Sequence, residues 1–314
     1  MKIYVGVTDN EWFNFLSNLS VQVGVDEVNF WQPSGESVFK SLKPGELFLF
    51  KLHSPLDYIV GGGVFAYSTV LPISLAWDAF KEKNGANSYT EMRRKIVRYR
   101  RTSDSGVEDF KIGCILLTQP FFFGESDWFN VPEWKSPIVR GKGYDLNSEA
   151  GKFMWKKIEN VLAKKEEPDS LDIKVGHIEE RDRYGSEILV KPRLGQGTFK
   201  ILVTDAYNRS CAVTSERALP VLEAAHIRPY SKDGPHEVQN GILLRSDMHK
   251  LFDTGYMTIT PKLEIEVSRS IKEEFDNGKY YYDYHGSQLL VPERLDQRPS
   301  QEFLIWHNEN IYKG

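Results

Sequence analysis

Residues 221–253 read VLEAAHIRPYSKDGPHEVQNGILLRSDMHKLFD, and they hold three of the chain's seven histidines. The segment LPVLEAAHIRP favours a strand, GILLR favours a second extended stretch, and SDMHKLFDTG favours a helix. The predicted helix has Ser246 as its N-cap and Gly255 just past its end. Strand, loop, strand and helix in this order predict a ββα unit.

Four side chains in this unit suit one kind of chemistry. His249 and Asp253 are four residues apart, so on a helix they leave the same face. An imidazole nitrogen and a carboxylate oxygen at that spacing can hold one divalent metal. His226 precedes the end of its strand, and a near-neutral histidine is suited to take a proton from water. Asn240 can bond a backbone carbonyl and fix the loop, so the set predicts metal-assisted phosphodiester hydrolysis.

The motifs LEAAHI-x-P, NGILL and H-x-x-x-D resemble the HNH motif of ββα-metal endonucleases. The similarity extends over residues 193–285 to HNH domains of the bacterial restriction endonuclease type. The resemblance implies that His226 is the general base, Asn240 the orienting residue, and His249 a metal ligand. Asp253 stands where related sites have a second helix ligand, and the implied metal is Mg²⁺ or Mn²⁺.

One position departs from the HNH pattern. Many HNH sites carry a metal-binding Asp or His just before the base, whereas Ala224 and Ala225 precede His226 here. This leaves two protein ligands, with water and DNA phosphate completing the metal's coordination. Glu223 is expected to support the site by hydrogen bonding or to pair with an arginine. His236, in the loop KDGPHEV, is expected at the surface, with a DNA contact as the alternative.

Composition limits the other possibilities. The 314 residues are 40% hydrophobic and 27% charged, with net charge −4, as in a soluble globular protein. No run approaches the roughly 18 apolar residues of a membrane span, and the first residues contain no apolar signal core. We therefore expect a cytoplasmic protein with no membrane contact. With only Cys114 and Cys211, a four-cysteine site cannot form, so no structural zinc is expected.

The chain is predicted to be an α+β protein with two domains. Residues 1–163 form the first domain, 164–189 a charged linker, and 190–314 the nuclease domain. ELFLFKLHSPLDYIVGGGVF resembles the strand pattern of PUA-like β-barrels, a superfamily that includes the EVE, YTH and SRA readers of modified bases. The expected fold is therefore an N-terminal PUA-like β-barrel with helices and a C-terminal ββα-metal HNH domain. A domain of this kind joined to an HNH domain resembles the domain arrangement of modification-dependent restriction endonucleases.

A reader of this kind must take one nucleotide out of the stack and hold it against aromatic rings. We expect Trp31 to form a wall of a modified-base pocket and Gln32 to hydrogen-bond the edge of the base. Asp9 and Trp12 are the alternative residues for these two roles. Each tryptophan has the alternative of being a core residue of a strand-rich domain.

A basic run, RRKIVRYRR, occupies residues 93–101. On a helix Arg93, Arg94, Arg98 and Arg101 share one side, which predicts contacts with DNA phosphates. The alternative is a solvated basic helix face.

The predicted function is hydrolysis of double-stranded DNA near 5-methylcytosine or 5-hydroxymethylcytosine. The alternatives are an HNH nuclease that cuts unmodified DNA, with or without sequence specificity, and a catalytically weak DNA-binding module. A homodimer is possible, because the apolar residues of the C-terminal segment can pack either on the chain's own core or on a second subunit. These residues are Phe303, Leu304, Trp306 and Ile311.

Overall fold

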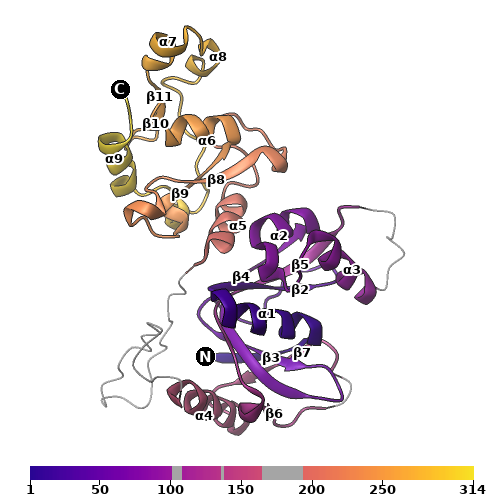
Figure 1. Ribbon diagram of the computed structural model, residues 1–314. Helices are drawn as coiled ribbons and strands as arrows, with labels where there is room; N and C mark the ends of the chain where they lie inside the picture. The colour runs from indigo at the N-terminus through magenta and orange to yellow at the C-terminus, as the bar shows by residue number, and fades with distance from the viewer. Residues whose placement is uncertain (101–107, 136–137, 165–193) are drawn as a thin grey trace, which may run out of the picture. The chain divides into compact units, whose positions relative to one another are not determined.

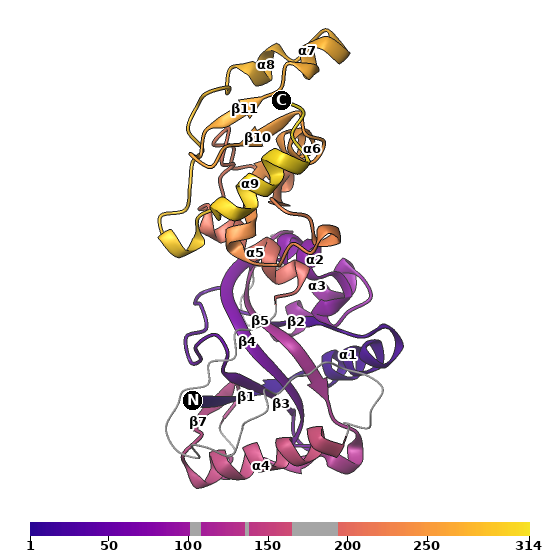
Figure 2. The ribbon, with the colours of Figure 1, turned by 90° about the vertical axis from the view of Figure 1, so that its left-hand side faces the viewer.

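The computed structural model describes residues 1–100, 108–135, 138–164 and 194–314. The chain divides into two compact units, Met1–Arg193 and Leu194–Gly314, which are coloured indigo to magenta and salmon to yellow (Figures 1 and 2). Of the predicted linker, residues 165–189 lie outside the described residues. Within the described ranges, the structure contains no helix long and apolar enough to span a membrane.

The first unit is built on one mixed sheet of seven strands in its described part. The strands run in the order β2, β5, β4, β3, β1, β7, and β6 pairs with β4. β1 and β3 are parallel, whereas the other pairs are antiparallel. The strands are β1 (Lys2–Thr8), β2 (Glu27–Gln32), β3 (Leu47–Leu52), β4 (Tyr58–Pro72), β5 (Lys111–Phe122), β6 (Phe129–Asn130) and β7 (Gly141–Asp145).

The predicted PUA-like barrel is not confirmed. A barrel requires strand pairing all the way round, and in the described residues the strand path is open, with β2 at one end and β7 at the other. β6 and β7 are short, with two and five residues, so they do not carry the pairing round to β2. What the structure shows is a mixed sheet with helices, in agreement with the predicted α+β class.

Helices cover both faces of this sheet. They are α1 (Asn10–Val23), α2 (Ile73–Phe80), α3 (Tyr89–Tyr99) and α4 (Glu149–Lys164). Both views place α4 near β7 and place α2 with α3 at the end of β2 and β5 (Figures 1 and 2). Because side chains alternate along a strand, Leu47 and Leu49 of β3 join the core cluster under Met154 of α4. Phe48 and Phe50 face the other way into an aromatic cluster.

The second unit contains the predicted ββα arrangement as β8 (Leu222–His226), β9 (Gly241–Arg245) and α6 (Ser246–Asp253). β8 and β9 are antiparallel, with His226 opposite Gly241. Ser246 is the first residue of α6 rather than its N-cap, which is Arg245. Gly255 lies just past the helix with φ +80°, as its predicted role requires. The other elements are α5 (Gln196–Ala206), β10 (Met257–Ile259), β11 (Ile265–Val267), α7 (Ser270–Phe275), α8 (Lys279–Tyr282) and α9 (Gln301–Asn310).

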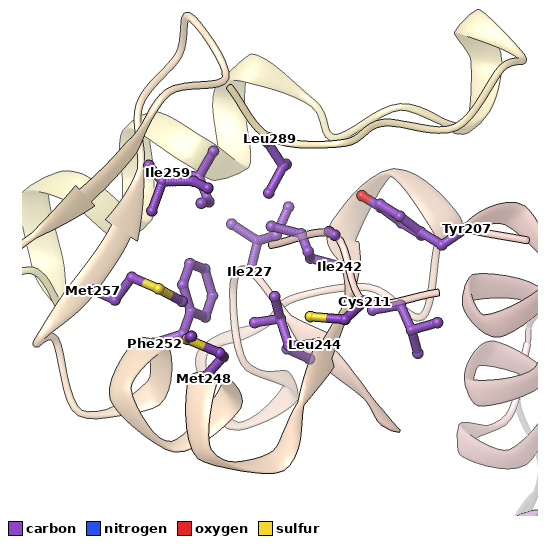
Figure 3. Close-up of a cluster of buried hydrophobic side chains, with 14 of the residues drawn as sticks. Tyr207, Cys211, Ile227, Ile242, Leu244, Met248, Phe252, Met257, Ile259 and Leu289 are labelled. Atoms are coloured by element: carbon purple, nitrogen blue, oxygen red, sulfur yellow. The ribbon is translucent and has the colours of Figure 1, made fainter. Parts of the chain in front are cut away.

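One apolar core holds these elements together. Figure 3 shows Leu244 of β9, Met248 and Phe252 of α6, and Met257 of β10 turned toward one another, all of them fully or almost fully buried. Leu304 of α9 is also buried in this cluster. Of the two packing alternatives for the C-terminal segment, this residue therefore takes the chain's own core. Burial of such large apolar side chains contributes about 1.5–3 kcal/mol each, which keeps α6 firmly seated on the hairpin.

Candidate active site

The ββα unit positions the site by its own packing. β8 ends at His226, and α6 lies against β8 and β9 (Figure 1). His249 of α6 contacts both Glu223 and Asp253, so these three side chains lie together on one side of the unit. Leu222 and Ala225 of β8 are buried in the core, and this fixes the strand's orientation. The structure thus brings together side chains that lie up to 30 residues apart in the sequence.

His249 sits between two carboxylates. Its Nδ1 lies 2.6 Å from Oε2 of Glu223, and its Nε2 lies 3.3 Å from Oδ2 of Asp253. Burial alone lowers the pKa of His249, but the hydrogen bonds and charges of Asp253 and Glu223 outweigh it, so the pKa is raised. With the proton on Nδ1 donated to Glu223, a metal ion that replaced the proton on Nε2 would lie between His249 and Asp253.

The donor pair formed by His249 and Asp253 fits a divalent ion. Two ligands at right angles, each about 2.1 Å from a metal, are separated by about 3 Å, close to the 3.3 Å between Nε2 and Oδ2. In the described part of the chain, the structure contains no group of three or more His, Cys, Asp or Glu side chains arranged for a metal. The remaining coordination positions would therefore belong to water and substrate oxygens.

Ala225 stands where many HNH sites have a metal-binding residue, and its small side chain fits the packed core at that position. Ala225 is completely buried in the core cluster of the second unit. Glu223 lies two residues earlier, on the same face of β8, because side chains alternate along a strand. Its exposed carboxylate extends to His249, so it is the acidic group that β8 supplies at this face.

His226 is held between an aromatic ring and another histidine. Its ring stacks on Phe199 of α5 with centroids 3.9 Å apart and an interplanar angle of 13°. Its Nε2 lies 3.0 Å from Nδ1 of His236. Burial, followed by the charges of His236 and His249, lowers the pKa of His226 to about 4, with Asp253 opposing the shift. The ring is therefore neutral at pH 7, which a proton acceptor requires.

Asn240 holds the loop between the two strands. Its side chain is completely buried, and its Oδ1 accepts the backbone N–H of Arg228 at 2.9 Å. Its Nδ2 donates to the carbonyl oxygens of Arg228 and Pro235, both at 2.9 Å. The backbone carbonyl of Asn240 also accepts the N–H of Ile227 at 2.9 Å. One amide therefore fixes the backbone that follows His226 and the backbone that precedes His236.

His236 has a partner that the sequence did not indicate. It was expected at the surface or in contact with DNA, whereas it is half-buried and bonded to His226. Its ring also stacks on Tyr230 at 4.7 Å with an interplanar angle of 5°, and it lies 5.8 Å from the ring centroid of Phe199. The HNH motif has no position that corresponds to His236. A separation of ten residues across a loop is also not a spacing at which a helix or a strand would bring it beside His226. The one available signal was the gathering of three histidines in a single stretch.

The last helix braces α6. His307 of α9 is almost completely buried, and its ring stacks on Phe252 at 3.8 Å. The hydroxyl of Thr258 donates to its Nδ1 at 2.8 Å, and its Nε2 donates to the carbonyl of Phe252 at 3.0 Å. Because Phe252 precedes Asp253, this contact fixes the end of α6 that carries a candidate metal ligand.

In the first unit, the two tryptophans predicted for a base pocket lie in the core. Trp31 is 8% exposed and donates its Nε1–H to the carbonyl of Asn84 at 3.1 Å. Trp12 is 2% exposed and packs edge-on against Phe30 and Phe50, with ring centroids 5.5 and 5.2 Å away. Both rings are largely covered by protein.

The other two residues predicted for the base pocket lie at the ends of elements. Asp9 is the N-cap of α1 and accepts the N–H of Trp12 at 2.8 Å. Its Oδ2 accepts from the hydroxyl of Tyr99 and lies 3.3 Å from the guanidinium of Arg98. Gln32 is half-buried at the end of β2, paired with Gly113. Asp9 therefore links α1 to α3.

A cavity of about 530 Å³ lies elsewhere in the first unit. Its lining includes Lys51, His53, Asp57, Asn130 and Trp134. The ammonium group of Lys51 is almost completely buried, lies 4.7 Å from the ring centroid of Trp134, and pairs with Asp57. The cavity thus combines hydrogen-bond donors and acceptors with an indole ring.

The predicted phosphate-binding arginines lie in different surroundings. Arg94 is exposed on α3, and Arg93 lies over the ring of Phe110 at 5.8 Å. Arg98 is half-exposed, but it forms ion pairs with Asp9 and with Glu11. Arg101 lies outside the described residues. Part of the positive charge on this helix is therefore balanced by α1, and its contact with DNA stays a prediction.

Comparison with known proteins supports one part of this site. A family model described as "HNH endonuclease" matches residues 211–260, which contain the four motif residues. This HNH domain implies a nuclease, and a nuclease of this kind acts on DNA. No match was found among curated proteins.

Among solved structures, a modification-dependent TagI restriction endonuclease is similar at 14% identity and a TM-score of 0.27. The alignment covers 85% of this chain and 61% of that one, so the chain spans about three fifths of that protein's length.

Proposed function

We propose that the chain is a metal-dependent DNA endonuclease whose base is His226 and whose metal ligands are His249 and Asp253. The observation that carries this proposal is the position of His249, which bonds Glu223 through one nitrogen and faces Asp253 with the other. His226 belongs to the same small unit and is neutral at pH 7. Asn240 completes the site by holding the loop.

The chain's own residues account for the proton transfer. His226 takes a proton from water, and the resulting hydroxide attacks phosphorus while the bond from phosphorus to the 3′ oxygen breaks. The leaving oxygen takes a proton from solvent, so the products are a 5′-phosphate and a 3′-hydroxyl. Phe199 and the loop fixed by Asn240 keep the ring of His226 in place during this transfer. Such fixed orientation removes much of the entropic cost of the reaction.

A divalent ion would be held by Nε2 of His249 and the carboxylate of Asp253. When bound, Mg²⁺ or Mn²⁺ would stabilise the negative charge that develops on the phosphate. By accepting the proton on Nδ1 of His249, Glu223 would fix the orientation of the ring and make Nε2 the nitrogen that binds the ion, as carboxylates do beside metal-binding histidines.

The central test is a plasmid-cleavage assay of His226→Ala with added Mg²⁺ or Mn²⁺. The variant should bind DNA as the wild type does and lose cleavage, by about 10²–10⁴-fold for a general base. His285→Ala is the matched control, because His285 is an exposed histidine of the same unit. Full cleavage by His226→Ala would exclude the assignment.

A catalytically weak DNA-binding module is the second candidate, and it is favoured because the described residues offer two protein ligands, His249 and Asp253, and no group of three. The same assay separates the two. Tight DNA binding by the wild type without nicking, even in Mn²⁺, would support the module.

We further propose that the first unit reads a modified cytosine. The support is the sequence pattern of ELFLFKLHSPLDYIVGGGVF and the cavity at Lys51, which offers an indole ring and polar groups for a base edge. Because Trp31 and Trp12 are already covered, this cavity is the better candidate for the base.

Digestion of matched DNAs that carry cytosine, 5-methylcytosine or 5-hydroxymethylcytosine tests the reader proposal. A methyl group in a fitted pocket changes rates by about 10–200-fold, so we expect a clear preference at limiting enzyme. Trp134→Ala should reduce that preference and leave basal cleavage. Equal cleavage of all three DNAs would exclude the reader and leave the nuclease proposal intact, because an HNH nuclease on unmodified DNA is its alternative.

A homodimer would supply two sites for the two strands of DNA. Ile305 of α9 is 42% exposed, while Leu304 of the same helix is buried in its own unit. Sedimentation of the protein with and without DNA tests this proposal, and a strict monomer that only nicks DNA would refute it.

A further inference from the structure

The contact between His226 and His236 restricts where the protons on both rings can lie. The 3.0 Å between Nε2 of His226 and Nδ1 of His236 is a hydrogen bond, so one of these two nitrogens carries the shared proton and the other accepts it. Both rings cannot donate at this contact. The tautomer of His226 is therefore tied to that of His236.

Only one of the two arrangements leaves His226 able to act as a base. If His236 donated, the lone pair of Nε2 would be occupied and Nδ1 of the neutral ring would carry its proton. If His226 donates through Nε2–H, its Nδ1 is left unprotonated. Across the described residues the structure gives this Nδ1 no hydrogen-bond partner, and the atom is not among the buried unpaired ones. It is accessible to water.

The loop and the neighbouring rings hold both imidazoles at this contact. His236 directly follows Pro235, whose carbonyl is held by Nδ2 of Asn240 at 2.9 Å. Its ring is stacked on Tyr230, and the ring of His226 is stacked on Phe199. Both imidazoles are thus held in place by aromatic rings beside them.

We propose that His236 is a positioning residue that accepts the Nε2–H of His226 and so makes Nδ1 of His226 the nitrogen that takes the proton from water. This inference rests on the proposed role of His226 as the base. In the reaction, the water proton moves to Nδ1, and the imidazolium keeps its Nε2–H bonded to His236. Asn240 then acts on both histidines through the loop.

The first measurement is the tautomer of His226 itself, from long-range ¹H–¹⁵N spectra of protein with labelled histidine at pH 7. The expected result is a proton on Nε2 and none on Nδ1. In His236→Phe, which keeps an aromatic ring but has no acceptor, this preference should be lost. A wild-type His226 protonated on Nδ1 would overturn the inference.

The second measurement is cleavage kinetics. His236→Phe should lower kcat by about 10²-fold, as misplacement of a catalytic group does, with little change in KM. His236→Asn should regain most of the lost kcat, because the amide oxygen occupies the place of Nδ1 and accepts the same proton. The matched control is His285→Phe, the same substitution at an exposed site. Unchanged kcat in His236→Phe would refute the proposal.

These outcomes are separable from those of the nuclease assignment. If His236→Phe fails to fold, the wild-type tautomer and the kcat of His236→Asn still decide. If the wild type cuts no DNA, the proposed function fails. The ¹H–¹⁵N spectra then still show whether His236 accepts the proton of His226. If His226→Ala loses cleavage while His236→Phe keeps it, only the inference about His236 is lost.

Discussion

Removing the amide of Asn240 should weaken both the stability and the activity of the second unit. In Asn240→Ala three partly buried hydrogen bonds to the backbone of Arg228 and Pro235 are lost. At about 0.5–1.5 kcal/mol for each, the free energy of unfolding should fall by about 2–4 kcal/mol. Because the loop beside His226 and His236 is then released, cleavage at a temperature where the variant is folded should fall by about 10²-fold.

Native-state hydrogen exchange of amides in β8 and β9 measures the stability of this unit separately. Asn308→Ala is the matched control, because its Nδ2 also donates to two backbone carbonyls, those of Ile259 and Leu304, at 2.7 Å. The control should lose about 1–2 kcal/mol and keep its cleavage rate. If Asn240→Ala loses stability but cuts like the control, the loop does not position the base and the reasoning is refuted.

Three other changes give separate tests. Glu223→Gln removes the charge beside Nδ1 of His249, so its Kd for Mn²⁺ by calorimetry should rise by about 10-fold or more; an unchanged Kd would remove the orienting role. Burial lowers the pKa of His307 to about 4, below that of an unfolded histidine, so the unfolded state binds the proton first as the pH falls. Between pH 6.5 and 4 the wild type should therefore lose about 3 kcal/mol more than His307→Gln in urea denaturation, and equal losses would contradict this. Gly255→Ala should cost about 1–3 kcal/mol in the same assay, because φ is +80° and the new Cβ would lie 2.0 Å from the carbonyl oxygen of Ile311; Gly286→Ala, with φ +77° and open space, should cost less.

The ββα unit could be predicted because its signals are local. GILLR is a short apolar run, and β9 lies there with four of its five residues buried. The spacing of His249 and Asp253 is set by one helical turn, so their proximity follows from the helix alone. The side chains of Glu223 and Asn240 form their hydrogen bonds near the strand ends, and their roles in catalysis stay predictions.

The remaining features depend on contacts that local patterns do not contain. The pairing of His226 with His236 depends on the path of an irregular loop fixed by Asn240. The open path of the first sheet depends on which distant strands pair, although the strand pattern of ELFLFKLHSPLDYIVGGGVF, which contains β3 and the start of β4, was recognisable. The burial of Lys51 depends on its partner Asp57 and on Trp134, 83 residues away in the chain, and a lysine in a strand gives no local sign of such a cavity.

The brace between α9 and α6 has a consequence for the order in which the protein is made. His307 is synthesised 55 residues after Phe252, whose carbonyl it holds. At about 5–20 residues per second, a ribosome needs roughly 3–11 s to cover that distance. During this interval the segment bearing Asp253 has left the peptidyl-transferase centre without its later support. The nascent chain therefore passes through a period in which its candidate active site is incomplete, and full assembly waits for translation to reach α9.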